Sequence, residues 1–274
     1  MLLQDKRLNL ESGIFKLESA VVAFSGGIDS TLVLAVANKV LNGRVLAVTA
    51  KSDSVPEREL RAAKELTQAL DINHKVIRTE EMSSPDYLKN SGNRCYYCKS
   101  ELYAKLAMVS SQYKITSILN GINLDDLGDH RPGILAAKEA GIISPLVESQ
   151  LNKQDIRNLA RDMGLTNWGK PALACLSSRI PYGQPVTAKK LSMIDEAEEI
   201  FLEEGFKEVR VRHYGDMARI ELLKTEIPIL MKNGLYKKTM YRLKNIGFQK
   251  ITIDPEGYRS GSLNEALDLN GEST

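Results

Sequence analysis

The feature that most constrains this chain is a short polar loop between two apolar segments near the N-terminus. Residues 20–24 have the length and apolarity of a buried strand, whereas residues 31–41 have the apolar spacing of a helix. The loop between them reads SGGIDS. A tight turn from a strand into a helix leaves backbone N–H groups at the helix start without partners, and glycines let a ligand approach them. The pattern therefore predicts an anion-binding site, with phosphate as the natural ligand.

A plain glycine turn with a serine or aspartate helix cap is the alternative for this loop. Its place directly after a strand and before a helix favours the phosphate site. The loop has neither the lysine of G-x-x-x-x-G-K-[ST] nor the spacing of G-x-G-x-x-G. It resembles the PP-loop of the ATP pyrophosphatase superfamily, whose members cleave ATP between the α and β phosphates and adenylate a substrate. The resemblance implies that ATP phosphates, with Mg²⁺, are bound by Ser25, Gly26, Gly27, Asp29 and Ser30.

Strand and helix patterns alternate beyond this loop. Residues 44–50, 73–79 and 115–121 have strand patterns, and residues 56–70, 95–113, 133–141 and 152–164 have helical ones. Such alternation is typical of an α/β fold in which helices cover both faces of a parallel sheet. Together with the loop, it predicts a PP-loop ATP pyrophosphatase domain of the adenine nucleotide alpha hydrolase type.

A second polar loop follows the strand at 115–121 and reads GINLDDLGDHRPG over residues 121–133. Ligands of parallel sheets bind beyond the carboxyl ends of the strands, and both polar loops occupy such ends. We therefore expect the two loops to line one site. Its candidate residues in the second loop are Asn123, Asp125, Asp126 and Arg131.

The pattern changes towards the C-terminus. A helix is expected over 187–204, two strands over 207–214 and 217–223, a helical stretch over 227–246 and a last strand over 248–255. This order predicts a smaller α+β domain. We place the PP-loop domain at residues 1–183 and the C-terminal domain, for substrate binding or assembly, at residues 184–274.

Composition narrows the possible partners. The 274 residues carry a net charge of only +2, which speaks against a nucleic-acid-binding surface. No apolar span of membrane length occurs, and charges interrupt the N-terminal residues throughout. We therefore expect a cytoplasmic protein without a membrane anchor.

Three cysteines stand out, because an odd number in a chain without secretory features argues against a disulfide framework. Cys95 and Cys98 form a C-x2-C pair at a helix start, and Cys175 lies 77 residues further on. Three thiolates can hold a [4Fe-4S] cluster with one iron left open, which we favour. A redox dithiol or persulfide relay and a zinc site completed by His74 or His130 are the alternatives.

Three stretches together resemble the LarE family, the sulfur transferases of nickel-pincer cofactor biosynthesis for lactate racemase. They are SGGIDS, G-x-N-x-D-D-x-x-D-x-R-P-G and PALACLSSRIPYG, and the resemblance covers almost the whole chain. It implies adenylation of pyridinium-3,5-biscarboxylic acid mononucleotide and conversion of its carboxylate to a thiocarboxylate. In one group of the family, the cysteine at the position of Cys175 gives up its own sulfur. A second group adds C-x-x-C and uses three cysteines to hold a [4Fe-4S] cluster, and Cys95, Cys98 and Cys175 match that group.

The family resemblance also implies a homo-oligomer and a set of substrate-binding residues, and leaves the primary sulfur donor open. Arg210 and Arg212 share one face of a strand, either as a solvated face or, as the family implies, to bind the mononucleotide phosphate. Arg179 either holds a substrate carboxylate or anchors its loop. Ser178 and Glu221 complete the candidate set.

Three other functions compete with sulfur insertion into a mononucleotide. A PP-loop enzyme that thiolates tRNA would need an RNA-binding surface, which the charge does not indicate. A relative of the ammonia-using NAD or GMP synthetases would leave the three cysteines without a role. A non-catalytic nucleotide-binding module would not need the acidic second loop.

Overall fold

The computed structural model describes residues 1–128, 132–171, 174–232 and 234–259. The chain forms two compact units. The first contains residues 1–84 and 93–173, and the second contains residues 85–92 and 174–274.

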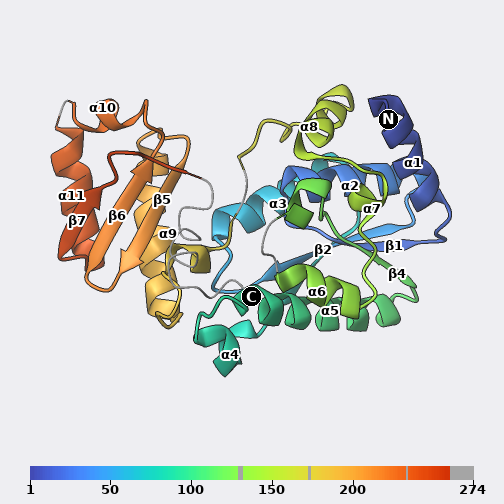
Figure 1. Ribbon diagram of the computed structural model, residues 1–274, viewed down its shortest axis with the longest axis horizontal. Coiled ribbons are helices and arrows are strands. Elements are labelled where there is room, and N and C mark those ends of the chain that lie inside the picture. The colour runs from blue at the N-terminus through green and yellow to red at the C-terminus, as the bar shows by residue number, and fades with distance from the viewer. Residues whose placement is uncertain (129–131, 172–173, 233, 260–274) are drawn as a thin grey trace. The chain divides into compact units, whose positions relative to one another are not determined.

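The first unit is built on a parallel sheet, as predicted. Its strands are β1 (Ala20–Ala23), β2 (Val45–Lys51), β3 (His74–Arg78) and β4 (Ser117–Leu119), in the order β3-β2-β1-β4 (Figure 1). The chain runs outward from β1 to β3 and then returns to place β4 on the other side of β1. The strand order therefore reverses between β1 and β4, where ligands of such sheets bind.

Helices cover both faces of this sheet, because β1 is apolar on both sides. Ala20 and Val22 pack into one core with α1 (Leu3–Phe15), α2 (Ile28–Val40), α3 (Glu57–Ala69), α7 (Pro145–Glu148) and α8 (Lys153–Asp162). Val21 packs into a second core with α5 (Arg94–Gln112) and α6 (Pro132–Glu139). The short helices η1 (Glu81–Ser83) and η2 (Leu124–Gly128) complete the described elements of this unit.

The second unit is the predicted smaller α+β part. It contains α4 (Pro85–Leu88), η3 (Leu176–Arg179), α9 (Ala188–Glu203), β5 (Val209–Tyr214), β6 (Met217–Leu222), α10 (Ile227–Leu230), α11 (Leu235–Ile246) and β7 (Lys250–Ile253). β5 and β6 form an antiparallel hairpin and β7 pairs with β6 in parallel. The single helical stretch expected over 227–246 is two helices, because Gly234 adopts φ +71° immediately before α11.

The compact units do not coincide with the predicted division after residue 183. Residues 174–183 and 85–92 both group with the C-terminal unit. Asn90 explains this grouping, since its Nδ2 donates to the carbonyls of Ile180, Pro181 and Gln184. The functional boundary at residue 183 stays a prediction.

Across the described ranges, no helix combines the length and apolarity needed to span a membrane.

Candidate functional site

The SGGIDS loop leads directly from β1 into α2 and leaves the start of that helix without a side-chain cap. Gly27 is the N-cap residue, in extended conformation, so the serine or aspartate cap considered above is not formed. Gly26 has φ +73°, and a Cβ there would lie 3.3 Å from Cα of Ala63 on α3. The positive φ favours glycine at this position, and a side chain would also make a tight contact with α3. The first N–H groups of α2 are left for a ligand, as in other phosphate-binding loops.

The side-chain hydroxyls of the two serines in this loop contact each other. The Ser25 and Ser30 hydroxyls lie 3.1 Å apart, and the Ser30 hydroxyl donates to the Gly27 carbonyl at 3.0 Å. The backbone N–H groups of Ser25 and Gly27 donate to the Ser30 and Ser25 hydroxyls, respectively. These bonds fix the loop with both hydroxyls at the helix start.

The second polar loop meets the first, as the topology predicts. A Cβ on Gly121 would lie 2.7 Å from the backbone N of Ser30, so Gly121 lets the loops touch. Asn123 donates from Nδ2 to Oδ1 of Asp29 at 3.5 Å. Asp126 accepts from the Asn123 backbone N–H and Asp125 accepts from that of Lys153. Arg131 and His130 lie outside the described residues.

Lys153 and Asn167 are site residues that the sequence patterns did not indicate. Lys153, the first residue of α8, places its Nζ 2.5 Å from Oδ2 of Asp29. Asn167 donates from Nδ2 to the Gly26 carbonyl at 3.1 Å and to the Thr31 hydroxyl at 2.9 Å. Both lie more than a hundred residues from the loop, so no local motif signals them.

The C-x2-C pair lies at the start of α5, as predicted, with its two cysteines about one helical turn apart. Both sulfurs belong to half-buried residues. A Cβ on Gly133 would lie 3.5 Å from the Cys95 carbonyl, so the start of α6 packs on this turn. Cys175 belongs to the other compact unit, immediately before η3.

Within the described residues, no three His, Cys, Asp or Glu side chains group closely enough to hold a metal ion. His74, an alternative zinc ligand, contacts the Thr49 hydroxyl through Nε2 at 2.8 Å instead. Burial, and to a lesser extent the charge of Lys64, lowers the pKa of His74. The meeting of the three cysteines stays a prediction.

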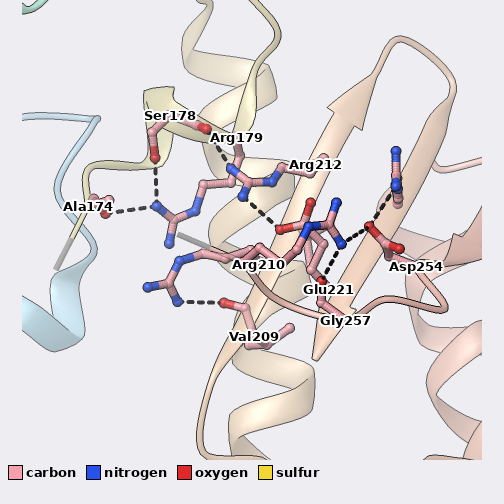
Figure 2. Close-up of polar contacts among 12 residues, drawn as sticks. Ala174, Ser178, Arg179, Val209, Arg210, Arg212, Glu221, Asp254 and Gly257 are labelled. Carbon is pink, nitrogen blue, oxygen red and sulfur yellow. Dashed lines mark hydrogen bonds and ion pairs between the residues drawn. The ribbon is translucent and has the colours of Figure 1, made fainter. Parts of the chain in front are cut away.

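In the second unit, Arg179 anchors the backbone around Cys175. Its Nη1 donates to the Ala174 carbonyl and to the Ser178 hydroxyl, both at 2.9 Å (Figure 2). It also donates to the Cys175 carbonyl at 3.1 Å. Its Nε donates to Glu198 of α9 at 2.8 Å, and this pair is almost fully buried. The loop-anchoring role expected as one alternative is therefore visible in the contacts of Arg179.

Arg210 and Arg212 extend from the same face of β5, whereas Val209 and Val211 pack into the core. The solvated-face interpretation is wrong for Arg212, whose side chain is only 7% exposed. Its guanidinium donates to the Ser178 carbonyl at 2.8 Å and to Glu221 at 2.7 Å. Figure 2 shows these arginines beside the Ala174–Ser178 segment.

Arg210 is largely buried, with charges of both signs near it. Its Nη2 lies 3.4 Å from a carboxylate oxygen of Glu208. Its guanidinium carbon is 4.8 Å from the centre of the Tyr258 ring. Burial, followed by the charge of Arg179, lowers the pKa of Arg210 below its usual value. A bound anion would offset both effects, because it stabilises the charged guanidinium.

The fold and the two touching loops define a nucleotide-binding α/β domain of the PP-loop type. A family model for the queuosine biosynthesis protein QueC matches residues 19–91, which include the SGGIDS loop. Over its length, the chain is 37% identical to pyridinium-3,5-bisthiocarboxylic acid mononucleotide synthase of Lactiplantibacillus plantarum, with 97% of this chain and 96% of that protein aligned.

Two further relatives extend this similarity. An uncharacterized protein of Synechocystis is 42% identical over 97% of this chain and 99% of its own length. Another, from Methanocaldococcus jannaschii, is 29% identical over 90% of this chain and 93% of its own length. The chain belongs to the LarE family of PP-loop ATP-dependent sulfurtransferases.

Proposed function

We propose that this protein adenylates a carboxylate of pyridinium-3,5-biscarboxylic acid mononucleotide and converts it to a thiocarboxylate. The observation that carries the proposal is the 37% identity to the L. plantarum synthase across nearly the whole chain. The uncapped start of α2, with Asp29 and Asn123 at its side, supports ATP as the co-substrate. The chain's cysteines offer two routes for the sulfur.

Adenylation is needed because a carboxylate is a poor acceptor for a sulfur nucleophile. Direct attack would require oxide to leave, whereas attack on the acyl adenylate releases AMP. In this proposal the backbone N–H groups of Ile28, Asp29 and Ser30 bind the phosphates and stabilise the charge that develops on pyrophosphate. Asp29, Asn123 and Asp125 offer the oxygen ligands that Mg²⁺ prefers. When bound, Mg²⁺ would neutralise phosphate charge.

The mononucleotide binds through the second unit in this proposal. Arg210 and Arg212 share a strand face, and a guanidinium pair suits a phosphate dianion. Glu221 orients the Arg212 fork through their 2.7 Å contact. Arg179 and Ser178 set the backbone that carries Cys175.

Sulfur reaches the activated carbonyl through Cys175, alone or with Cys95 and Cys98. Thiolates are the ligands of iron–sulfur clusters. Two cysteines one turn apart on α5 are suited to bind two irons of the same cluster. When bound, a [4Fe-4S] cluster would supply an iron without a protein ligand as the sulfur-binding site. In the other route the Cys175 thiolate attacks the acyl adenylate and displaces AMP to form a thioester. Loss of the Cys175 Cα proton to a base and cleavage of its Cβ–S bond then release the thiocarboxylate and leave dehydroalanine.

Pyrophosphate release tests the ATP-dependent step. The purified chain should release pyrophosphate from Mg²⁺-ATP when the mononucleotide is added, and Asp29→Ala should abolish this release while the protein stays folded by circular dichroism. Unchanged release in that variant would contradict the loop assignment. Release that requires tRNA instead of the mononucleotide would favour a tRNA-thiolating enzyme.

Iron content and the fate of Cys175 separate the two sulfur routes. Anaerobic reconstitution should give about four irons per chain and a broad visible band. Serine at position 95, 98 or 175 should weaken cluster retention and stop sulfur transfer while adenylation continues. Recovery of dehydroalanine at position 175 after one turnover, with Cys95→Ser and Cys98→Ser fully active, would replace the cluster route with sacrifice of Cys175.

A further inference from the structure

We propose, on the basis of the function proposed above, that Lys153 is a phosphate-binding residue of the ATP site. The SGGIDS loop has no lysine of its own, unlike loops in which a lysine reaches the terminal phosphates of the nucleotide. The fold brings one from α8, which lies 124 residues away along the chain. We assign Lys153 to the β and γ phosphates, which leave together as pyrophosphate.

The SGGIDS loop fixes the position of the Lys153 ammonium. Nζ lies 2.5 Å from Oδ2 of Asp29, the second residue of α2. Asp29 is held from its other oxygen by Asn123 at 3.5 Å. An ammonium has three N–H donors, and one contact with Asp29 leaves donors for a phosphate. The side chains of Lys153 and Asp29 are 29% and 23% exposed, so a ligand can reach the pair.

The backbone of Lys153 is held just as firmly. Its N–H donates to Oδ2 of Asp125 at 2.8 Å, which ties the start of α8 to the second loop. Asn152 caps α8 by accepting from the Asp155 backbone N–H at 2.9 Å. Both ends of the lysine, backbone and ammonium, are therefore fixed at the two loops.

A lysine at this position is unfavourable for the helices themselves. Lys153 is the first residue of α8, and its ammonium lies in the first turn of α2. Helix starts carry partial positive charge and favour acidic residues. The ammonium and the start of α2 thus lie beside the carboxylate of Asp29, and the start of α8 lies beside that of Asp125. A polyphosphate bound at these helix starts would gain from their partial positive charge and from the ammonium.

A purely structural tie to α8 is available for comparison in the same unit. Lys6 of α1 pairs with Asp155 of α8 at 2.5 Å, with side chains that are 15% and 19% exposed. Neither Lys6 nor Asp155 belongs to the two polar loops. Lys6→Met is therefore a matched control that removes an ion pair of the same length to the same helix.

The test compares the affinities of ATP and AMP in the presence of Mg²⁺, by calorimetry with the mononucleotide left out. Lys153→Met should weaken ATP binding by about tenfold, the value of one charge-assisted hydrogen bond. It should change AMP binding by less than about twofold, because AMP has no β or γ phosphate. Lys153→Arg should keep ATP affinity within about threefold of the unsubstituted chain, and Lys6→Met should alter neither affinity.

Equal losses for ATP and AMP in Lys153→Met, or no loss for ATP, would overturn the assignment of Lys153. A loss of ATP affinity in Lys6→Met as large as that in Lys153→Met would also overturn the assignment. It would show that ATP affinity depends on the position of α8 as a whole and not on the Lys153 ammonium. If the unsubstituted chain binds ATP but never thiolates the mononucleotide, the proposed function fails and the role of Lys153 stands. If the unsubstituted chain does not bind ATP, both fail.

Discussion

At the scale of single residues, Gly121 shows how one missing side chain allows two loops to form one site. A Cβ there would lie 2.7 Å from the backbone N of Ser30, and backbone atoms cannot give way cheaply. Gly121→Ala should destabilise the protein by about 1–3 kcal/mol, as expected for overpacking, and weaken ATP binding. Urea unfolding and calorimetry measure the two effects.

The matched control for Gly121 comes from the same loop. A Cβ on Gly128 would meet no atom within 4 Å. Gly128→Ala should therefore leave both stability and ATP affinity nearly unchanged. Equal effects of the two substitutions would contradict the close contact between Gly121 and Ser30.

Asn167 stabilises the SGGIDS loop through hydrogen bonds from its side-chain amide. The amide donates to the Gly26 carbonyl and the Thr31 hydroxyl, and the residue is 8% exposed. Asn167→Asp removes the donor and sets a carboxylate against a carbonyl, so it should cost about 1–3 kcal/mol and reduce ATP affinity. Asn158→Asp is the control, because Asn158 of α8 is only half-buried and its Oδ1 accepts from Gln154, which a carboxylate also can do. Equal stabilities for the two variants in urea would contradict this role.

At the scale of elements, a buried ion pair joins η3 to α9 and fixes the loop that carries Cys175. Glu198 accepts from Arg179 and from the Val211 backbone N–H. Arg179→Met removes the guanidinium that donates to the buried Glu198 carboxylate, which should lower the free energy of unfolding by about 3–5 kcal/mol. The loss of stability should be confined to the second unit. ATP binding should therefore persist while sulfur transfer is lost.

Limited proteolysis combined with ATP binding measures this separation for Arg179→Met. New cleavage sites should appear within residues 174–259, while ATP affinity stays within about twofold of the unsubstituted chain because the nucleotide loops lie in the other unit. Full sulfur transfer activity in Arg179→Met would contradict the anchoring role.

The elements themselves were largely predictable, because their signals are local. The strand at 20–24, the loop and the following helix are neighbours in sequence, and the C-x2-C pair lies at the start of a helix as its position indicates. α1 was not predicted, because charges interrupt its sequence and only Leu10 and Ile14 are buried. The break before α11 depends on the left-handed backbone of Gly234, which the helical pattern does not reveal.

The site was predictable only where its residues lie within motifs. Asp29 and Asn123 belong to the two polar loops and meet as expected. Lys153 and Asn167 reach the first loop from 124 and 141 residues away, so only the folded chain reveals them. The burial of Arg212 likewise depends on the Ser178 carbonyl, 34 residues earlier, which strand alternation cannot show.

At the scale of the whole molecule, two histidines make stability sensitive to mild acid. Burial lowers the pKa of His74 in the first unit and of His213 in the second, where the charge of Lys190 adds to the effect. The unfolded chain protonates each histidine near pH 6.5, whereas the folded chain resists protonation. The unfolded state therefore binds more protons below that pH, and the free energy of unfolding should fall as pH drops from 7.5 to 5.5.

His213 provides a variant that isolates this effect in the second unit. It is 3% exposed and packs edge-on against Phe248. Among the residues that the structure describes, none forms a hydrogen bond with either of its ring nitrogens. His213→Leu should reduce the loss of stability between pH 7.5 and 5.5, as measured by urea unfolding at each pH. An unchanged pH dependence in this variant would show that His213 does not titrate on unfolding.

The most direct test of the ATP-dependent sulfur transfer is the stoichiometry of one anaerobic reaction. The reconstituted chain, Mg²⁺-ATP, a sulfide source and the mononucleotide are combined, and product mass, AMP and pyrophosphate are followed together. We predict one AMP and one pyrophosphate for each oxygen of the mononucleotide that is replaced by sulfur. Asp29→Ala should give no AMP, no pyrophosphate and no thiolated mononucleotide. Sulfur insertion without pyrophosphate, or pyrophosphate release without any change in the mononucleotide, would contradict it.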